Sequence, residues 1–149
     1  MNTNTNISHS ILNSQFSTFN YLGKGWSFPP AFIKGYGAEM AAGEEDIRQS
    51  LTILFSTVPG ERIFRFDYGC DVCRWVFEKM DLSVETLIID SIKQAILYFE
   101  PRIETEKISI ESKDPQKGIL WINIDYTLRS TNSRSNMVYP FYFKEGTNL

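Results

Sequence analysis

The stretch Phe99-Glu100-Pro101-Arg102 joins two segments that differ in hydrophobic period. Before it, apolar side chains recur every three or four residues, as on one face of an amphipathic helix: Leu87, Ile88, Ile92, Ala95, Ile96 and Phe99. From Ile103 onward the period is two, which is typical of a strand. Pro101 cannot donate a hydrogen bond inside a helix, and it favours an extended backbone at Glu100. The stretch therefore predicts a helix that ends at Phe99 or Glu100 and a strand that begins at Ile103.

The two charged residues of this Glu-Pro-Arg joint allow two interpretations. A carboxylate and a guanidinium flank a rigid proline, so neither side chain can turn freely. In one interpretation Arg102 lies near the negative end of the helix and both side chains are solvated. In the other, the pair is a contact site for a partner protein. The pattern alone favours the first interpretation, because charged residues at helix ends usually serve local electrostatics.

Further helices are predicted on both sides of a turn-rich middle segment. Three acids in Gly43-Glu44-Glu45-Asp46 precede apolar residues at helical spacing, which predicts a helix from there to about Thr57. Ser83 is the predicted N-cap of the helix that ends at the joint. Between the two helices we expect an extended run over residues 62–66 and a short helix over residues 74–79.

Three strands are predicted in the C-terminal third: Ile103–Glu111, Ile119–Leu128 and Met137–Lys144, with a turn at residues 114–118. Pro140 lacks the N–H of a ladder donor, so the third strand belongs at a sheet edge or carries a bulge. The element order predicts an α+β fold, with two main helices packed on one face of a three-stranded, mainly antiparallel sheet. One sheet edge stays open in this arrangement, and an open edge can pair with another chain.

Length and composition indicate one globular domain with a polar extension. Twelve of residues 1–20 are Asn, Ser or Thr, which predicts a flexible arm and leaves the domain at residues 21–149. A net charge of −3 gives no electrostatic reason to bind nucleic acid. No apolar run approaches the roughly 18 residues of a membrane span, and the arm lacks the features of a secretory signal. We therefore expect a cytoplasmic protein that neither binds nucleic acid nor inserts into membranes.

Cys70 and Cys73 form a Cys-x-x-Cys pair. A zinc site needs about four ligands, and the chain's one histidine, His9, belongs to the arm. The surroundings do not have the strand-helix pattern of a thioredoxin-like redox pair. We expect two reduced, partly buried thiols, and no metal or cofactor.

Catalysis finds little support in the sequence. A glycosidase needs two carboxyl groups at a defined separation, one of them able to donate a proton. Glu44, Glu45, Asp46 and Glu100 are candidates by number only, and the first three lie where helix-start acids belong. With a single histidine in the arm, no Ser-His-Asp or Cys-His triad can be assembled. The sequence favours a protein without catalytic residues, with a lysozyme-like enzyme as the alternative.

Several motifs occur in the order seen in one known family: Gly23-Lys24-Gly25-Trp26-Ser27-Phe28-Pro29-Pro30, Gly43-Glu44-Glu45-Asp46-Ile47-Arg48-Gln49-Ser50-Leu51, Pro59-Gly60-Glu61-Arg62, Phe99-Glu100-Pro101-Arg102-Ile103 and residues 136–146. Over residues 21–147 the chain resembles the baseplate wedge proteins, or sheath initiators, of contractile phage tails, type VI secretion systems and extracellular contractile injection particles. The joint and the acidic helix start are the most specific parts. The Asn-rich arm and Cys73 depart from the family, and some of its members carry a lysozyme-like label.

The resemblance implies a structural baseplate component that templates sheath assembly. Its sheet edge would pair with arms of the first ring of sheath subunits, by strand addition. The implied handshake residues are Val138, Tyr139, Phe141, Tyr142 and Phe143, and the implied contact with the wedge core is Glu100, Pro101 and Arg102. The implied partners are sheath subunits and other wedge proteins, then spike, hub or tube proteins, with six copies in a baseplate that assembles in the cytoplasm or forms part of a virion tail or injection particle. An adaptor domain whose edge pairs only with itself is the remaining alternative.

Overall fold

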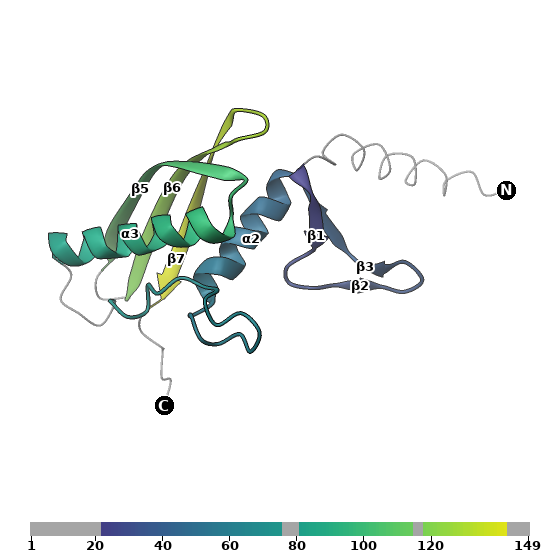
Figure 1. Cartoon of the computed structure of the whole chain (residues 1–149), viewed down its shortest axis with the longest axis horizontal. Coiled ribbons are helices and arrows are strands. Elements are labelled where there is room, and N and C mark those ends of the chain that lie inside the picture. Colours follow the sequence, from purple (N-terminus) through teal and green to yellow (C-terminus); the bar gives the residue numbers. More distant parts are fainter. Residues whose placement is uncertain (1–21, 76–80, 115–117, 143–149) are drawn as a thin grey trace. The chain divides into compact units, whose positions relative to one another are not determined.

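The computed structural model describes residues 22–75, 81–114 and 118–142 (Figure 1). Elements follow in the order β1 (Lys24–Trp26), β2 (Phe32–Ile33), β3 (Gly37–Ala38), β4 (Met40–Ala42), α2 (Glu44–Ser56), α3 (Leu82–Phe99), β5 (Ile103–Asp114), β6 (Ile119–Leu128) and β7 (Ser133–Tyr142). The chain separates into two compact units, one up to Gln49 and one from Ser50, and the boundary lies inside α2. Within the described residues, no helix is both long and apolar enough to span a membrane. The structure confirms a mixed fold with two helices and antiparallel sheets.

The first unit contains two short antiparallel ladders, β1 with β4 and β2 with β3. Gly25 of β1 lies against the start of α2, because a Cβ atom there would come within 2.6 Å of the Asp46 carboxylate. The side-chain oxygen of Gln49 accepts a hydrogen bond from the backbone N–H of Phe28 at 2.8 Å. The Gln49 amide in turn donates to Glu45 at 3.0 Å. These contacts fix the strands of this unit to the first turns of α2.

Helix α3 begins two residues earlier than predicted. Asp81 is the N-cap, and its carboxylate accepts a hydrogen bond from the backbone N–H of Val84 at 2.9 Å. The prediction of Ser83 as the cap is therefore wrong, since that residue lies inside the helix. The helix ends at Phe99, as predicted, and the N–H of Glu100 donates to the Ile96 carbonyl at 2.8 Å.

The second unit is built on the sheet β5-β6-β7, in which both neighbouring pairs are antiparallel. Side chains of β6 alternate along the strand, and those facing the core are buried: Leu120, Ile122, Ile124, Tyr126 and Leu128. Helix α3 crosses this face of the sheet (Figure 1). Its own buried positions recur at helical spacing: Val84, Ile88, Ile92, Ala95 and Ile96. Burying about ten such side chains is the main stabilising contribution in this unit.

Some predicted element bounds differ from the structure. β5 extends to Asp114, and β7 (Ser133–Tyr142) begins four residues before the predicted start at Met137, while the predicted last two residues, 143 and 144, lie outside the described residues. The extended run predicted at residues 62–66 is wrong, because this segment is a series of turns, with Arg65 N–H donating to the Arg62 carbonyl at 3.3 Å. Residues 71–75 are also turns, and most of the short helix predicted at residues 74–79 lies outside the described residues, as does the predicted arm at residues 1–20.

Candidate functional site

The Glu-Pro-Arg joint contains a forked ion pair. Nε of Arg102 donates to one oxygen of Glu100 at 2.5 Å, and a terminal guanidinium nitrogen donates to the other oxygen at 2.7 Å. The Glu100 side chain is 3% exposed, whereas that of Arg102 is 30% exposed. The interpretation of a solvated pair is therefore wrong for Glu100. Its carboxylate lies inside the protein and fixes the guanidinium in one orientation, while Pro101 lies exposed between them.

The joint lies at the end of the sheet where β7 begins. Ile103 pairs with Leu128 in the β5–β6 ladder, and Leu128 pairs with Ser133 in the β6–β7 ladder. Arg129, in the turn after β6, donates its backbone N–H to the Arg102 carbonyl at 3.0 Å. With strands about 4.8 Å apart, roughly 10 Å separates the joint from the first residues of β7. The joint therefore lies at the same end of the sheet as the first residues of β7. The predicted handshake residues Val138–Tyr142 pair with residues 119–123, toward the other end of β6.

The predicted handshake side chains divide between the two faces of β7. Val138 and Tyr142 are 50% and 65% exposed and point away from the core. Tyr139 and Phe141 are half-buried on the opposite face, and the Tyr139 ring lies 5.5 Å from the Phe55 ring of α2. Burial raises the pKa of the Tyr139 phenol. Of the four predicted handshake residues that the structure describes, Val138 and Tyr142 therefore present the larger share of their surface to a partner.

The backbone of β7 has a defined outward direction, which Pro140 reveals. Pro140 lies opposite Trp121 in a β6–β7 ladder without register shifts. Because proline has no N–H, this pair cannot exchange two hydrogen bonds, so the Pro140 nitrogen faces away from β6. The two kinds of pair alternate along an antiparallel ladder. The N–H and C=O groups of Arg134, Asn136 and Val138 therefore also face outward.

β7 is an edge strand of the described sheet, and its outer N–H groups form a row that ends at the proline. Residues 134–138 offer three consecutive outward N–H donors at every second position, and position 140 offers none. Phe143, the last predicted handshake residue, lies outside the described residues. The first half of β7 is thus the part best suited to pair with an added strand.

The opposite edge of the sheet, β5, is interrupted. The β5–β6 register shifts between Thr105 and Lys107, which leaves Glu106 as an extra residue in the strand. The Glu106 carboxylate accepts a hydrogen bond from the Thr127 hydroxyl at 2.5 Å, and it forms an ion pair with Arg134, whose Nε lies 3.3 Å away. Bulges and charged side chains are features that prevent an edge strand from pairing with another chain. The β7 edge is the more regular of the two.

A loop between α2 and α3 closes on itself beside the C-terminal half of α3. The Cys70 N–H donates to the Thr57 carbonyl at 3.0 Å, and the Gly60 N–H donates to the Phe66 carbonyl at 2.8 Å. Gly69 has a φ angle of +132°, and a Cβ atom there would overlap the Thr57 carbonyl oxygen. A glycine is therefore required where the two ends of the loop meet.

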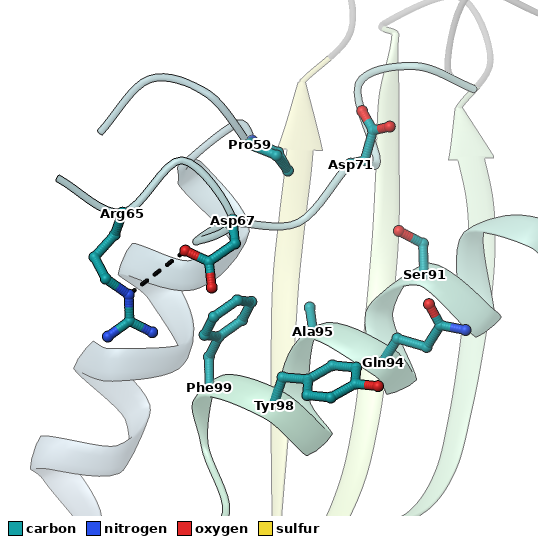
Figure 2. A pocket seen from close by; sticks show the side chains of 10 residues that line it. Pro59, Arg65, Asp67, Asp71, Ser91, Gln94, Ala95, Tyr98 and Phe99 are labelled. Atoms are coloured by element: carbon teal, nitrogen blue, oxygen red, sulfur yellow. Dashed lines mark ion pairs between the residues drawn. The ribbon is translucent and has the colours of Figure 1, made fainter. Parts of the chain in front are cut away.

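This loop and α3 enclose a pocket of about 440 Å³ (Figure 2). Its lining consists of Pro59, Arg65, Asp67, Gly69 and Asp71 from the loop, and of Ser91, Gln94, Ala95, Tyr98 and Phe99 from α3. Sequence reasoning missed this pocket. Its one signal is the row of small and polar residues at positions 91, 94, 95 and 98, which share one face of the helix.

The two thiols follow the prediction, since Cys70 is buried and Cys73 is half-buried. Burial raises the pKa of the Cys70 thiol to about 11, against a smaller lowering by its hydrogen bond with Ser91. Burial also raises the pKa of Cys73. Both changes favour the neutral thiol, which is a poor nucleophile and a poor metal ligand. Among the described residues, no group of three or more His, Cys, Asp or Glu side chains could hold a metal ion.

Two of the four acids considered for catalysis make contacts with neighbouring side chains of this chain. Both Glu100 oxygens accept hydrogen bonds from Arg102. Glu45 accepts a hydrogen bond from Gln49.

Comparison with known proteins identifies the family. The sequence profile of the family described as baseplate wedge protein gp25 matches residues 41–133. The chain belongs to this family. The matched region of this wedge protein includes α2, α3, the joint and the sheet up to the first residue of β7. The match confirms the resemblance that the motifs indicated. A search of curated proteins finds no significant match to the chain.

Several solved structures resemble the wedge protein, among them the following two. One is a crystal structure of a candidate tail lysozyme from Geobacter sulfurreducens, with 40% identity over 71% of this chain and 96% of that one, and a TM-score of 0.66. The other belongs to the cryo-EM structure of the anti-feeding prophage baseplate, with 29% identity over 85% of this chain and 90% of that one, and a TM-score of 0.61. Both likenesses extend over most of each chain, and their descriptions name a tail protein and a baseplate.

Proposed function

We propose that the wedge protein is a structural, non-catalytic subunit in the baseplate of a contractile injection machine, and that it templates the first ring of the sheath. The outer edge of β7 pairs with an extended arm of a sheath subunit, which joins the sheet as a fourth strand. The observation that carries this proposal is the regular row of outward backbone groups at Arg134, Asn136 and Val138, on the edge without a bulge. Backbone hydrogen bonds to such an edge supply affinity, and exposed side chains at alternate positions supply specificity.

The Glu-Pro-Arg joint serves in this proposal as the contact with the wedge core. Glu100 does not touch the partner, because its side chain is 3% exposed. It acts as a positioning residue that holds the guanidinium of Arg102, and the partner contacts Pro101 and the exposed part of Arg102. Because the joint and the start of β7 share one end of the sheet, one docking event places the open edge relative to the baseplate. In this proposal the protein assembles in several copies, six in a six-fold baseplate, with sheath and wedge subunits as neighbours.

Proline substitution at the outer edge of β7 tests the strand-addition step. Val138→Pro removes one outward N–H while leaving the hydrogen bonds to β6 in place, because position 138 belongs to the same outward set as Pro140. Val138→Thr is the matched control, since it keeps the donor and a β-branched side chain. We expect Val138→Pro to fold, as judged by circular dichroism, and to yield baseplates without sheath in electron micrographs. Val138→Thr should yield sheathed particles. Normal sheaths with Val138→Pro would disprove the pairing at this edge.

A neutral pair tests the joint. Glu100→Gln with Arg102→Gln removes both charges together and leaves two amides that can bond each other, so no buried charge stays unpaired. Arg129→Gln is the control, because it removes a guanidinium at the same end of the sheet. We expect the double variant to fold and to be lost from purified baseplates, whereas Arg129→Gln is retained. Retention of the double variant at the wild-type level contradicts the role of the joint.

A peptidoglycan-cleaving enzyme is the second candidate, favoured by the description of the Geobacter relative as a candidate tail lysozyme. The acids of this candidate are Glu44 and Glu100, together with Asp67 and Asp71 of the pocket. Purified protein at high concentration, added to a peptidoglycan suspension, separates the two functions. We expect no fall in turbidity. Clearing that is lost in a Gln or Asn variant of one of these acids would establish the enzyme and overturn the non-catalytic proposal.

A further inference from the structure

The pocket between the loop and α3 combines an apolar floor with a polar rim (Figure 2). Buried Ala95 and the ring of Phe99 supply the apolar part of the lining. Carboxylates of Asp67 and Asp71 lie at the rim on the loop side, and the Tyr98 ring lies on the helix side. A ligand that matches this lining therefore has an apolar portion and a polar group.

The charges of the pocket favour a cation. Arg65 Nε lies 3.5 Å from the Asp67 carboxylate, so these two charges largely offset each other. Asp71 is half-buried, and no ion pair among the described residues engages it. The pocket also lies along the last turns of α3, and that helix has no basic residue in its last turn to complement its negative end. The lining thus has one excess negative charge.

The aromatic side chains favour a planar cation over a compact one. In this same loop the guanidinium of Arg62 stacks 3.9 Å above the Tyr68 ring. Tyr98 at the rim is 75% exposed and offers a ring face of the same kind. A guanidinium can stack on such a ring and bind a carboxylate with two parallel hydrogen bonds, which an ammonium group cannot do.

We propose that this pocket binds an arginine side chain presented by another protein of the assembly. Its aliphatic stem lies on Ala95, and its guanidinium binds Asp71. The loop's own Arg65 lies at the other side of the pocket, with its guanidinium carbon 5.9 Å from the centroid of the Phe99 ring. The occupant comes from another chain, because Arg65 is the one arginine among the described residues that line the pocket and residues 1–21, 76–80, 115–117 and 143–149 contain no arginine. The identification of the arginine's parent protein as a baseplate subunit rests on the proposed function, whereas the preference for arginine does not.

Three short peptides serve as probes: acetyl-Ala-Arg-Ala-amide, its lysine analogue and its citrulline analogue, which has the shape of arginine without the charge. Each is titrated into the 15N-labelled full chain and followed by amide shifts in NMR spectra. We expect the arginine peptide to bind with a dissociation constant in the millimolar range, as is typical of one charged anchor, and to shift amides of residues 65–71 and 91–99. The lysine and citrulline peptides should bind at least about fivefold and tenfold more weakly, respectively.

Two variants test the pocket itself. Asp71→Asn should weaken the arginine peptide at least about fivefold, because it removes the charge that the guanidinium meets. Gln94→Arg places an arginine on α3 at the rim and should block the peptide by occupying the site, whereas Lys93→Arg, exposed on the same helix outside the lining, should bind as wild type does. Gln94 and Lys93 are both exposed, so the two arginine substitutions leave the fold intact.

The inference would be overturned if wild type showed no amide shifts at about 20 mM peptide, a concentration above the dissociation constant of a weak single-anchor contact. Equal binding of the citrulline peptide, shifts that map outside the pocket, or unchanged binding by Asp71→Asn would also overturn it. These outcomes are separate from those of the β7 test. Val138→Pro should bind the arginine peptide normally, and Asp71→Asn should leave the β7 edge intact, so each proposal can fail alone.

Discussion

Arg102→Ala removes both hydrogen bonds that the buried Glu100 carboxylate accepts, at 2.5 and 2.7 Å. The loss leaves a carboxylate that is 3% exposed without the cation that offsets its desolvation. Breaking a buried ion pair from one side typically costs about 3–5 kcal/mol, and two hydrogen bonds to charged groups give a similar sum. Because Arg102 is 30% exposed, the cost arises mainly from the stranded Glu100. Domains of this size are stable by about 5–15 kcal/mol, so the single variant loses a large share of its stability.

Urea unfolding followed by tryptophan fluorescence measures this loss, with the slope held common to all variants. We expect Arg102→Ala to lower the unfolding free energy by about 3–5 kcal/mol, and the melting temperature by about 6–20 °C. Glu100→Leu with Arg102→Leu should recover most of it, because replacing both partners by apolar side chains is often neutral. An Arg102→Ala loss below about 1 kcal/mol, or a double variant no more stable than the single one, would refute the reasoning. The single variant is also a poor assembly test, because instability alone could abolish assembly.

Three further predictions follow from the loop, the thiols and the cap. Gly69→Ala should destabilise the protein by at least about 2 kcal/mol in urea unfolding, because it adds an overlap with Thr57 to the strain of its positive φ, whereas Gly60→Ala, also at positive φ but with open space around its Cβ, should cost about 1 kcal/mol. Stability should fall between pH 9 and pH 11: the pKa of Cys70 is about 11 in the folded chain against an ordinary value of 9, so its neutral form stabilises the fold fully below pH 9 and loses about 2–3 kcal/mol as pH rises through this window. Cys70→Ala should show a shallower decline than Cys73→Ala, and equal slopes would contradict the assignment. Asp81→Ala should cost about 1 kcal/mol while Ser83→Ala costs close to nothing, and the reverse order in thermal unfolding would restore Ser83 as the cap.

Long periodic segments were predictable from the sequence because their pattern has a single cause. The apolar residues of α3 and the alternation of β6 arise from burial of one face. As predicted, α3 ends just before Glu100-Pro101 and β6 ends at Leu128. The cap of α3 was not predictable in this way. Asp81 and Ser83 are both good N-cap residues, and the choice depends on where the helix enters the core.

The joint shows more clearly which features a local sequence pattern does not predict. Its residues were identified from the sequence, but the burial of Glu100 depends on the core that surrounds the end of α3, which no local pattern contains. The alternating charged and apolar groups of residues 62–66 indicated a short strand or extended run, because a local pattern does not show which distant residues bond to the segment. Hydrogen bonds from residues far along the loop, such as Cys70 to Thr57, close this segment into turns instead. The pocket depends on the same closure, so it too was hidden.

The extra residue in β5 bears on how many neighbours the sheet can accept. A fold with two usable borders could accrete strands on both sides and propagate as a ribbon of its own copies. Because Glu106 shifts the register at the β5 edge, an added strand would meet a regular row of backbone N–H donors at the β7 edge of the described sheet and not at the β5 edge. The bulge thereby leaves one regular edge in the described sheet, which fits the proposed function of a subunit that starts a polymer without becoming part of its repeat.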